Sequence, residues 1–187
     1  RRLRNMVLIM FSLFFYSWGE PVWISLMLIS ASVDYVNGLI IENNRDNLLK
    51  KVGLISSIVI NLGILGFFKY SGFIAGNLNF LLSTNLPLKE FALPIGISFY
   101  TFQTLSYTID VYRGKTQAQK SYLNLLLFVS IFPQLIAGPI VRYVDIANEI
   151  ENRKESLDQF YTGVKRFIKG ISKKIIKDLG DGLILRR

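Results

Sequence analysis

The 187-residue sequence contains no histidine and no cysteine. The absence of cysteine excludes a disulfide framework, a thiolate zinc site and a cysteine nucleophile. The absence of histidine excludes an imidazole base, a Ser-His-Asp triad and a histidine-ligated metal within this chain, so we expect no metal site. Acidic residues are also scarce: 13 Asp and Glu stand against 22 Lys and Arg, which gives a formal charge of +9.

The charge has to be weighed against the apolar content of the chain. In a polar chain a basic excess suggests nucleic acid, but here 51% of the residues are hydrophobic and the mean hydropathy is +0.36. This combination is typical of membrane proteins, whose Lys and Arg gather at the cytoplasmic ends of helices. No aromatic stacking platform accompanies the basic residues. We therefore expect a lipid bilayer, and not nucleic acid, as the partner.

The beginning of the chain predicts a helical hairpin in the membrane over residues 6–41. One apolar run covers 6–18 and another covers 22–41, with the turn-forming GEP between them. A spanning helix needs about 20 apolar residues to cross about 30 Å of hydrocarbon. Arginines before the first run also resemble the start of a signal peptide, but no small-residue cleavage site follows. The first residue is Arg1, not Met, which indicates a processed or cut chain.

The next apolar run, residues 52–82, is too long for one upright helix, so we predict a long or broken helix there. Residues 42–51 in front of it are polar and basic and are expected to form a cytoplasmic loop. Lys69 follows about 25 Å of helix, nearly a full crossing. We expect its amine to reach a membrane interface, with the remaining residues continuing as a tilted or interfacial piece.

Two later segments, 93–113 and 122–143, combine apolar residues with polar or helix-breaking ones. The first carries many hydroxyl and amide side chains, and the second contains Pro133 and Pro139. Polar residues in a membrane helix usually face other helices or a watery cavity, so residues 93–113 are predicted to line a polar interior path. Prolines at membrane depth require neighbours that satisfy the freed backbone groups, which favours a protein-facing position for the second segment as well.

The positive-inside rule gives a nearly consistent topology. The N-terminal arginines and residues 42–51 belong inside. If every later run crossed once, the basic residues within 165–177 would lie outside, against the rule. The conflict disappears if either 93–109 or 122–141 enters the membrane without crossing it, as a broken or re-entrant element; the sequence does not choose between them.

Residues 156–179 predict a basic amphipathic helix. Ser156 and Gln159 form a capping-box pattern at its start. Apolar residues recur at helical spacing on one face, and basic residues occupy the others. Such a helix lies in the headgroup plane, with its Lys and Arg on anionic lipid. The basic residues predicted for this interface are Lys165, Arg166, Lys169, Lys173, Lys174 and Lys177.

The candidates for lining the polar path are Gln103, Asp110, Arg113, Gln134 and Arg142. Asp110 and Arg113 share a helix face and either form an ion pair or hold substrate. For the other three, interhelical hydrogen bonding is the alternative to a lining role. Asp34 lies in an apolar run, where a charge is costly, and is either functional or a bundle-facing or helix-end carboxylate. No pair of these residues has the makings of a base and nucleophile.

Three blocks of sequence resemble the membrane-bound O-acyltransferase family. They are LPIGISFYTFQ with SYTIDVYRG within 93–114, FVSIFPQ with AGPIVRY within 128–143, and the helix residues Phe160, Gly163, FIKG at 167–170 and Lys173-Lys174. FFYSW at 14–18 is similar to the family's early membrane hairpin. The resemblance covers most of 14–183. It is closest to the bacterial alginate O-acetyltransferase branch, with the D-alanyl transferase that serves teichoic acids as a cousin.

The resemblance implies an all-α, multi-pass protein of the bacterial cytoplasmic (inner) membrane, with residues 1–187 forming a single partial domain of that fold. The family moves an acetyl or other acyl group from a cytoplasmic donor, through a catalytic tunnel, to a cell-surface or exported polysaccharide such as alginate. The donor, acetyl-CoA or an acyl-carrier thioester, is a co-substrate, and no bound cofactor is implied. Partner proteins and the polysaccharide acceptor are expected on the periplasmic or extracellular side.

The family's catalytic histidine lies in a later helix and has no counterpart in this sequence, so we expect the chain alone to be inactive. The resemblance gives the polar candidates a place in the tunnel wall and not in proton transfer. Two alternatives remain: D-alanyl transfer for teichoic acids by a related enzyme, and a non-enzymatic membrane subunit for transport or assembly.

Overall fold

The computed structural model describes residues 2–44, 46–82, 93–135, 141–153 and 156–184, and these ranges contain helices but no strand. The chain divides into two compact units, Arg1–Glu151 and Asn152–Arg187. The helices are α1 (Arg2–Gly19), α2 (Ile24–Asn43), α3 (Asn47–Leu82), α4 (Ile97–Tyr112), α5 (Tyr122–Ser130), α6 (Phe132–Leu135), α7 (Tyr143–Asn152) and α8 (Leu157–Ile184).

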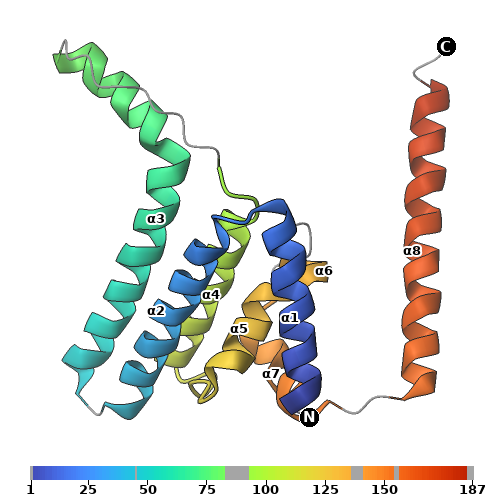
Figure 1. Cartoon of the computed structure of the whole chain (residues 1–187), viewed down its shortest axis with the longest axis horizontal. Helices are drawn as coiled ribbons and strands as arrows, with labels where there is room; N and C mark the ends of the chain where they lie inside the picture. The colour runs from blue at the N-terminus through green and yellow to red at the C-terminus, as the bar shows by residue number, and fades with distance from the viewer. Residues whose placement is uncertain (1, 45, 83–92, 136–140, 154–155, 185–187) are drawn as a thin grey trace. The chain divides into compact units, whose positions relative to one another are not determined.

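The first unit is a helical bundle in which α2 packs against both α3 and α4, and α4 also contacts α3 and α5 (Figure 1). On the other side, α1 packs on α5 and α6. The interior of this bundle contains large aromatic side chains, among them Tyr16, Tyr100, Tyr107 and Phe128, all fully buried. Helices α2 and α4 therefore hold the centre, where the polar side chains discussed below lie.

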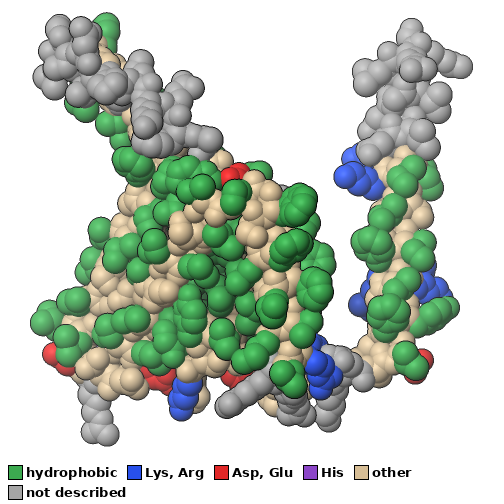
Figure 2. All heavy atoms as spheres, in the orientation of Figure 1, with side chains coloured by type: hydrophobic (Ala, Val, Ile, Leu, Met, Phe, Trp, Pro, Cys, Tyr) green, Lys and Arg blue, Asp and Glu red, His purple; other side chains and the backbone are tan. Residues whose placement is uncertain are grey.

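Two of the described helices are long and apolar enough to cross a membrane: Ile24–Asn43 and Asn47–Leu81. The 20 residues of α2 extend about 30 Å, the thickness of a bilayer's hydrocarbon core. Large apolar side chains such as Met10, Phe11 and Val59 are exposed. Figure 2 shows hydrophobic side chains over the middle of the visible face of the bundle, and charged ones at its lower and upper edges. This surface suits contact with lipid.

Helix α3 is continuous over its 36 residues, which corresponds to about 54 Å. The segment expected to be long or broken is therefore one long helix in the structure. Its last turns extend past α2 in Figure 1. Lys69 is exposed, with its amine 5.6 Å from the centre of the Tyr70 ring. Its position at a membrane interface stays a prediction.

The segment predicted over 122–143 is broken. Helix α5 has 9 residues and α6 has 4, and about 14 Å of α5 is too short to cross the hydrocarbon alone. Ile131, between them, has ψ 114, outside the helical region. Pro133 has no N–H with which to continue the helical ladder. Residues 136–140 lie outside the described residues, so whether this segment is the re-entrant one stays a prediction.

Helix α8 makes up most of the second unit. Its start is confirmed: the backbone N–H of Gln159 donates to Ser156 Oγ at 3.2 Å, the N-cap bond that the sequence pattern predicts. Its described side chains are exposed on every face, including Phe160 and Phe167.

Candidate functional site

Helix α4 buries an unusual number of polar side chains. Thr101, Gln103, Thr104, Thr108 and Asp110 are each at most 3% exposed. They are buried because α4 is flanked by α2, α3 and α5. The polar residues of this segment face protein, as their number in the sequence suggests; whether they also line a tunnel stays a prediction.

Asp34, on α2, is the centre of a buried hydrogen-bond network. Its carboxylate accepts a bond from Ser57 Oγ, one from Asn61 Nδ2 at 2.9 Å and one from Thr108 Oγ1 at 3.0 Å. Within the part of the chain that the structure describes, no Lys or Arg pairs with this carboxylate. The carboxyl group is therefore held by neutral donors on α3 and α4, and Asp34 faces the bundle.

The network extends from Asn61 along α2 and α4. Asn61 Oδ1 accepts a hydrogen bond from Ser30 Oγ, which lies 3.4 Å from Thr104 Oγ1. Sequence analysis did not single out Ser30, Ser57 or Asn61. A usable signal was present, because Ser57 and Asn61 are four residues apart and so share a face of an apolar helix. The network joins the three helices through their polar faces.

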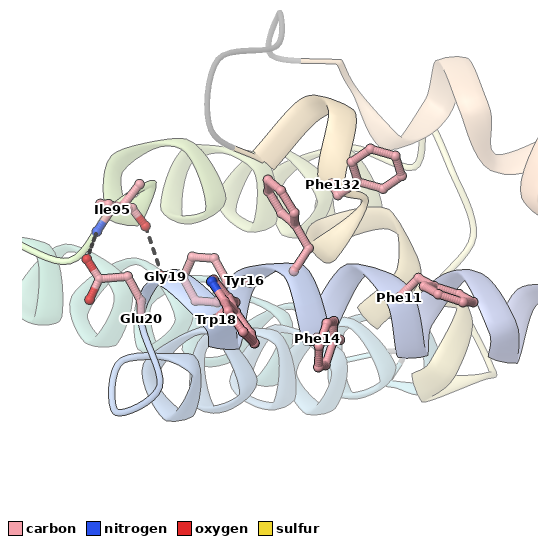
Figure 3. Close-up of a pocket in the computed structure, with 9 residues that line it drawn as sticks. Phe11, Phe14, Tyr16, Trp18, Gly19, Glu20, Ile95 and Phe132 are labelled. Atoms are coloured by element: carbon pink, nitrogen blue, oxygen red, sulfur yellow. Dashed lines mark hydrogen bonds between the residues drawn. The ribbon is translucent and has the colours of Figure 1, made fainter.

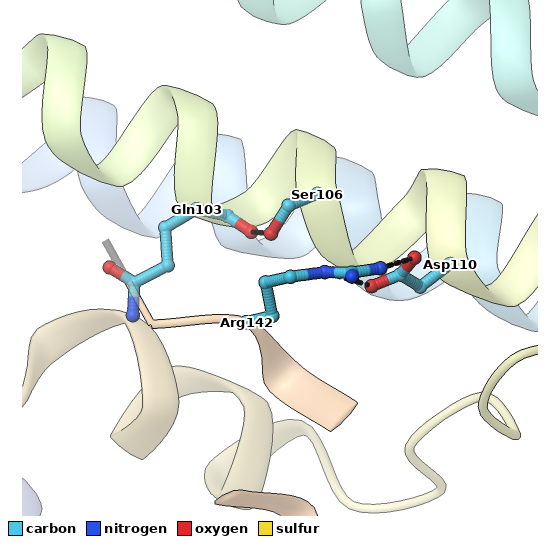
Figure 4. Close-up of polar contacts among 4 residues, drawn as sticks. All are labelled: Gln103, Ser106, Asp110 and Arg142. Atoms are coloured by element: carbon cyan, nitrogen blue, oxygen red, sulfur yellow. Dashed lines mark hydrogen bonds and ion pairs between the residues drawn. The ribbon is translucent and has the colours of Figure 1, made fainter. Parts of the chain in front are cut away.

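Gln103 and Asp110 lie on another face of α4, toward α5 and the segment before α7. Gln103 Nε2 donates to the backbone oxygen of Phe128 at 2.7 Å. Asp110 accepts both bonds of the Arg142 guanidinium, including one from Nε at 3.1 Å. Figure 4 shows the Arg142 side chain running along α4 to reach Asp110. Gln103 thus forms the interhelical hydrogen bond that was its alternative role.

The ion pair considered for Asp110 and Arg113 does not form. Asp110 is 2% exposed and pairs with Arg142, which is 47% exposed, whereas Arg113 is exposed at the C-cap of α4. Asp110 prefers Arg142 because this arginine approaches from another segment and makes two hydrogen bonds to the carboxylate. Such a bidentate contact is stronger and more directional than the contact that Arg113, three residues further along the same helix, could make. A role of Arg113 in holding substrate stays a prediction.

Gln134 belongs to a group of buried polar atoms that have no hydrogen-bond partner among the described residues. The group consists of Tyr100 Oη, Ser130 Oγ and Gln134 Nε2. Such atoms are rare in folded proteins because each loses its hydration without compensation.

The loop after α4 is held to the helices by Gln119, another residue that sequence analysis missed. Its backbone N–H donates to Tyr107 Oη at 2.9 Å, and its side-chain amide donates to Tyr143 Oη at 2.7 Å. The Tyr107 hydroxyl reaches this position by passing close to Gly38, where an added Cβ would lie 2.7 Å from the oxygen. These bonds tie the loop to α4 and α7.

A separate apolar pocket of about 410 Å³ lies along α1 (Figure 3). Aromatic rings of α1 and Phe132 of α6 form most of its wall, and Glu20 lies at one end. Tyr16 Oη donates to the Ile95 oxygen at 2.9 Å, and Glu20 Oε1 accepts from the Ile95 N–H at 3.4 Å. Its wall is apolar and belongs to the exposed surface of the bundle.

The six basic residues predicted to meet lipid are Lys165, Arg166, Lys169, Lys173, Lys174 and Lys177, and all are exposed on α8. Apolar side chains on the same helix are exposed too, for example Ile168 at 57% and Ile175 at 52%. This arrangement suits an interfacial helix, and lipid binding stays a prediction.

Comparison with known proteins finds relatives that are named as acyltransferases. The chain is 38% identical over 182 residues to the protein named "Probable alginate O-acetylase AlgI" of Pseudomonas syringae pv. tomato, covering 94% of this chain and 35% of the relative. It is 29% identical over 196 residues to a peptidoglycan O-acetyltransferase of Helicobacter pylori, covering 90% of this chain and 37% of the relative.

A shorter match, 29% identical over 85 residues, links the chain to a teichoic acid D-alanyltransferase of Bacillus subtilis; it covers 44% of this chain and 22% of the relative. No family model matches the chain, and no solved structure matches it significantly. The resemblance to the alginate O-acetyltransferase branch, inferred from the sequence blocks, is confirmed. The chain spans about a third of the length of the two longer matches (35% and 37%).

Proposed function

We propose that this chain forms part of the interior of a membrane O-acyltransferase, one that transfers acetyl groups to a cell-surface or exported polysaccharide such as alginate. The observation that carries the proposal is the 38% identity to an alginate O-acetylase over 94% of the chain. The polar residues buried on α4, inside a bundle with two helices able to cross a membrane, support it.

The chemistry needs a donor thioester and an acceptor hydroxyl. The hydroxyl oxygen forms a bond to the acyl carbon, the carbon–sulfur bond breaks, and the thiol leaves with a proton; a base takes the proton of the hydroxyl. The sequence contains no histidine, so an imidazole base would have to come from residues other than these. We propose that the residues of this chain bind substrate and stabilise the surrounding helices, and that they do not transfer the proton.

The donor we propose is acetyl-CoA or an acyl-carrier thioester, and the site is the bacterial inner membrane. Partner proteins outside the membrane would deliver the polysaccharide. Four of the candidate path residues lie on the side of α4 that faces α5 and α6: Gln103, Asp110, Gln134 and Arg142. Gln103 bonds the Phe128 oxygen there, and Asp110 of α4 binds the Arg142 guanidinium. We propose that this side faces the path.

Two other functions compete with this one. The match to a teichoic acid D-alanyltransferase supports D-alanyl transfer, over 44% of the chain. The same polar interior would also serve a non-enzymatic transport or assembly subunit, in which no covalent bond is made.

The three functions can be distinguished by deleting the gene, complementing the deletion and measuring which polymer loses its acyl groups. We expect ester-linked acetyl in the isolated exopolysaccharide or peptidoglycan to fall on deletion and to return on complementation. A loss confined to the D-alanine of teichoic acid would support the second function. If export of polysaccharide falls while its acetyl content per sugar is unchanged, the subunit function is correct and ours is wrong.

A further inference from the structure

The apolar pocket along α1 has one end where a membrane surface is expected. Helix α2, one of the two described helices long and apolar enough to cross a membrane, begins at Ile24, four residues after Glu20. The two tryptophans of the sequence, Trp18 and Trp23, stand on either side of Glu20, and tryptophan gathers where the hydrocarbon meets the headgroups. We therefore expect Glu20, at the end of the pocket, at the level of the lipid headgroups.

The other end of the pocket lies deeper along α1. The wall extends from Phe11 to Glu20, a distance of nine residues, which corresponds to about 14 Å of helix. One leaflet supplies half of the roughly 30 Å of hydrocarbon in a bilayer. The pocket thus has the depth of a single leaflet, which is the depth that an acyl chain of one phospholipid occupies.

Ring contacts fix the wall of the pocket. The ring centres of Phe14 and Trp18 are 5.9 Å apart, and Phe15 of α1 meets Phe132 of α6 at 5.7 Å. Trp18 is 82% exposed and Phe14 is 62% exposed. The rings therefore line a hollow that opens to the outside of the bundle, where lipid chains are expected.

Glu20 gives the pocket its charge. Among the described residues that line it, no Lys or Arg accompanies Glu20. Figure 3 shows the Glu20 side chain at the end of the pocket, where Oε1 accepts the Ile95 N–H at 3.4 Å. An ionised carboxylate has about four acceptor positions, so this one can accept further N–H donors. It attracts an ammonium group and repels a headgroup with a net negative charge.

We propose that this pocket binds a phospholipid with a primary ammonium headgroup, such as phosphatidylethanolamine. One acyl chain lies along the rings of α1, and the ammonium donates charge-assisted hydrogen bonds to Glu20. Phosphatidylcholine cannot make these bonds, because its quaternary nitrogen has no hydrogen. An acyl chain gains little by leaving other lipid chains for an apolar wall, so the headgroup decides which lipid is bound. This lipid site is independent of the acyl-transfer chemistry.

Photo-crosslinking of the full-length protein in nanodiscs tests the site. The probe is a phosphatidylethanolamine with a diazirine in one acyl chain, and the labelled residues are identified by mass spectrometry. We expect label within residues 11–18 or at Phe132. Unlabelled phosphatidylethanolamine should compete with the probe about threefold to tenfold better than phosphatidylglycerol or phosphatidylcholine.

Substitutions of Glu20 separate its charge from its place in the fold. Glu20→Gln keeps an oxygen that accepts from the Ile95 N–H but removes the charge. The advantage of phosphatidylethanolamine should therefore disappear, with the melting temperature in lipid-free detergent unchanged. Glu20→Lys should make phosphatidylglycerol the best competitor, a reversal that a merely structural Glu20 would not produce. The control, Glu149→Gln, removes an exposed acidic group of α7 and should preserve the order of the wild type.

Three results would overturn the lipid site. Label that is absent from 11–18 and from Phe132 would show that another part of the protein covers the pocket. Phosphatidylcholine or phosphatidylglycerol competing as well as phosphatidylethanolamine would show that Glu20 selects no ammonium group. An advantage of phosphatidylethanolamine that survives in both Glu20→Gln and Glu20→Lys would place the selection elsewhere on the protein.

Discussion

Asp34 accepts hydrogen bonds from three side chains on two other helices, Ser57 and Asn61 of α3 and Thr108 of α4. At about 0.6 kcal/mol for each interhelical bond between membrane helices, Asp34→Ala should lower the free energy of unfolding by about 2 kcal/mol. Asp34→Asn should cost less, because its amide oxygen still accepts from the two hydroxyls. Unfolding in mixed micelles measures both.

The control for Asp34 is Glu149→Gln, which removes an exposed acidic group and should change the free energy of unfolding by less than about 0.5 kcal/mol. If Asp34→Ala is as mild as this control, the carboxylate does not hold the three helices together. The order wild type, Asp34→Asn, Asp34→Ala is the pattern that the hydrogen bonds require.

The contact between Asp110 and Arg142 permits a double-mutant cycle with Asp110→Asn and Arg142→Met. Arg142 is 47% exposed, so solvent screens the pair, and we expect a coupling free energy of about 1 kcal/mol. The matched control pairs Asp110→Asn with Arg113→Met, for which the coupling should be near zero. Equal couplings in the two cycles would show that Arg142 has no special place beside Asp110.

At the level of helices, the approach of α2 to α4 depends on Gly38. A Cβ there would lie 2.7 Å from Tyr107 Oη and 3.2 Å from two ring carbons. Gly38→Ala should therefore destabilise the bundle by about 1–3 kcal/mol, measured by unfolding in the same micelles.

A second substitution tests the cause of this effect. In the Gly38→Ala background, Tyr107→Phe removes the closest atom and should cost less than it does in the wild type. Gly63→Ala is the control, because a Cβ at Gly63 meets nothing within 4 Å, and it should be neutral or stabilising by up to about 1 kcal/mol. If Gly38→Ala behaves like Gly63→Ala, the helices have room to separate at no cost.

The positions of most helices could be predicted from the sequence, because apolar runs and helix caps are local signals. The N-cap at Ser156 is confirmed, and the polar side chains of 93–113 are buried as their number suggests. The sequence did not predict whether α3 continues past Lys69. It does continue, because one lysine and several glycines do not interrupt the backbone hydrogen bonds.

The site was harder to predict, because its contacts join residues distant in sequence. Spacing alone pairs Asp110 with Arg113, but the partner is Arg142, 32 residues away. Gln103 was correctly singled out as polar, while its contact with the Phe128 oxygen depends on how α5 packs. The unpaired hydroxyl of Tyr100 could not be predicted from the sequence, because the hydrogen bonds of a buried hydroxyl depend on the side chains packed around it.

At the scale of the whole molecule, α8 should lie on anionic lipid. The sequence has no cysteine, so a single introduced cysteine carries a polarity-sensitive fluorophore at one position. In nanodiscs with anionic lipid, the emission of a label at Phe167→Cys should shift to the blue. A label at Lys169→Cys, about 200° around the helix, should report water. Equal emission from the two labels would contradict an interfacial helix.

The same experiment tests the contribution of charge. Each Lys or Arg near an anionic surface contributes about 1 kcal/mol to binding. Changing Lys165, Lys173 and Lys177 to Gln should therefore reduce the blue shift in anionic nanodiscs, and uncharged lipid should reduce it for the wild type too. A blue shift that does not depend on lipid charge would mean that the apolar face alone holds α8.

The central claim is that this chain belongs to an enzyme that moves acetyl groups onto polysaccharide. The most direct measurement uses membranes that contain the full-length protein and the partner proteins encoded next to its gene. These membranes receive ¹⁴C-acetyl-CoA or an acetylated carrier thioester as the donor, and unacetylated alginate or peptidoglycan as the acceptor. The account predicts base-labile label in the polysaccharide that requires the protein and both substrates. Label that appears equally without the protein, or polysaccharide that stays unlabelled with either donor, would contradict it.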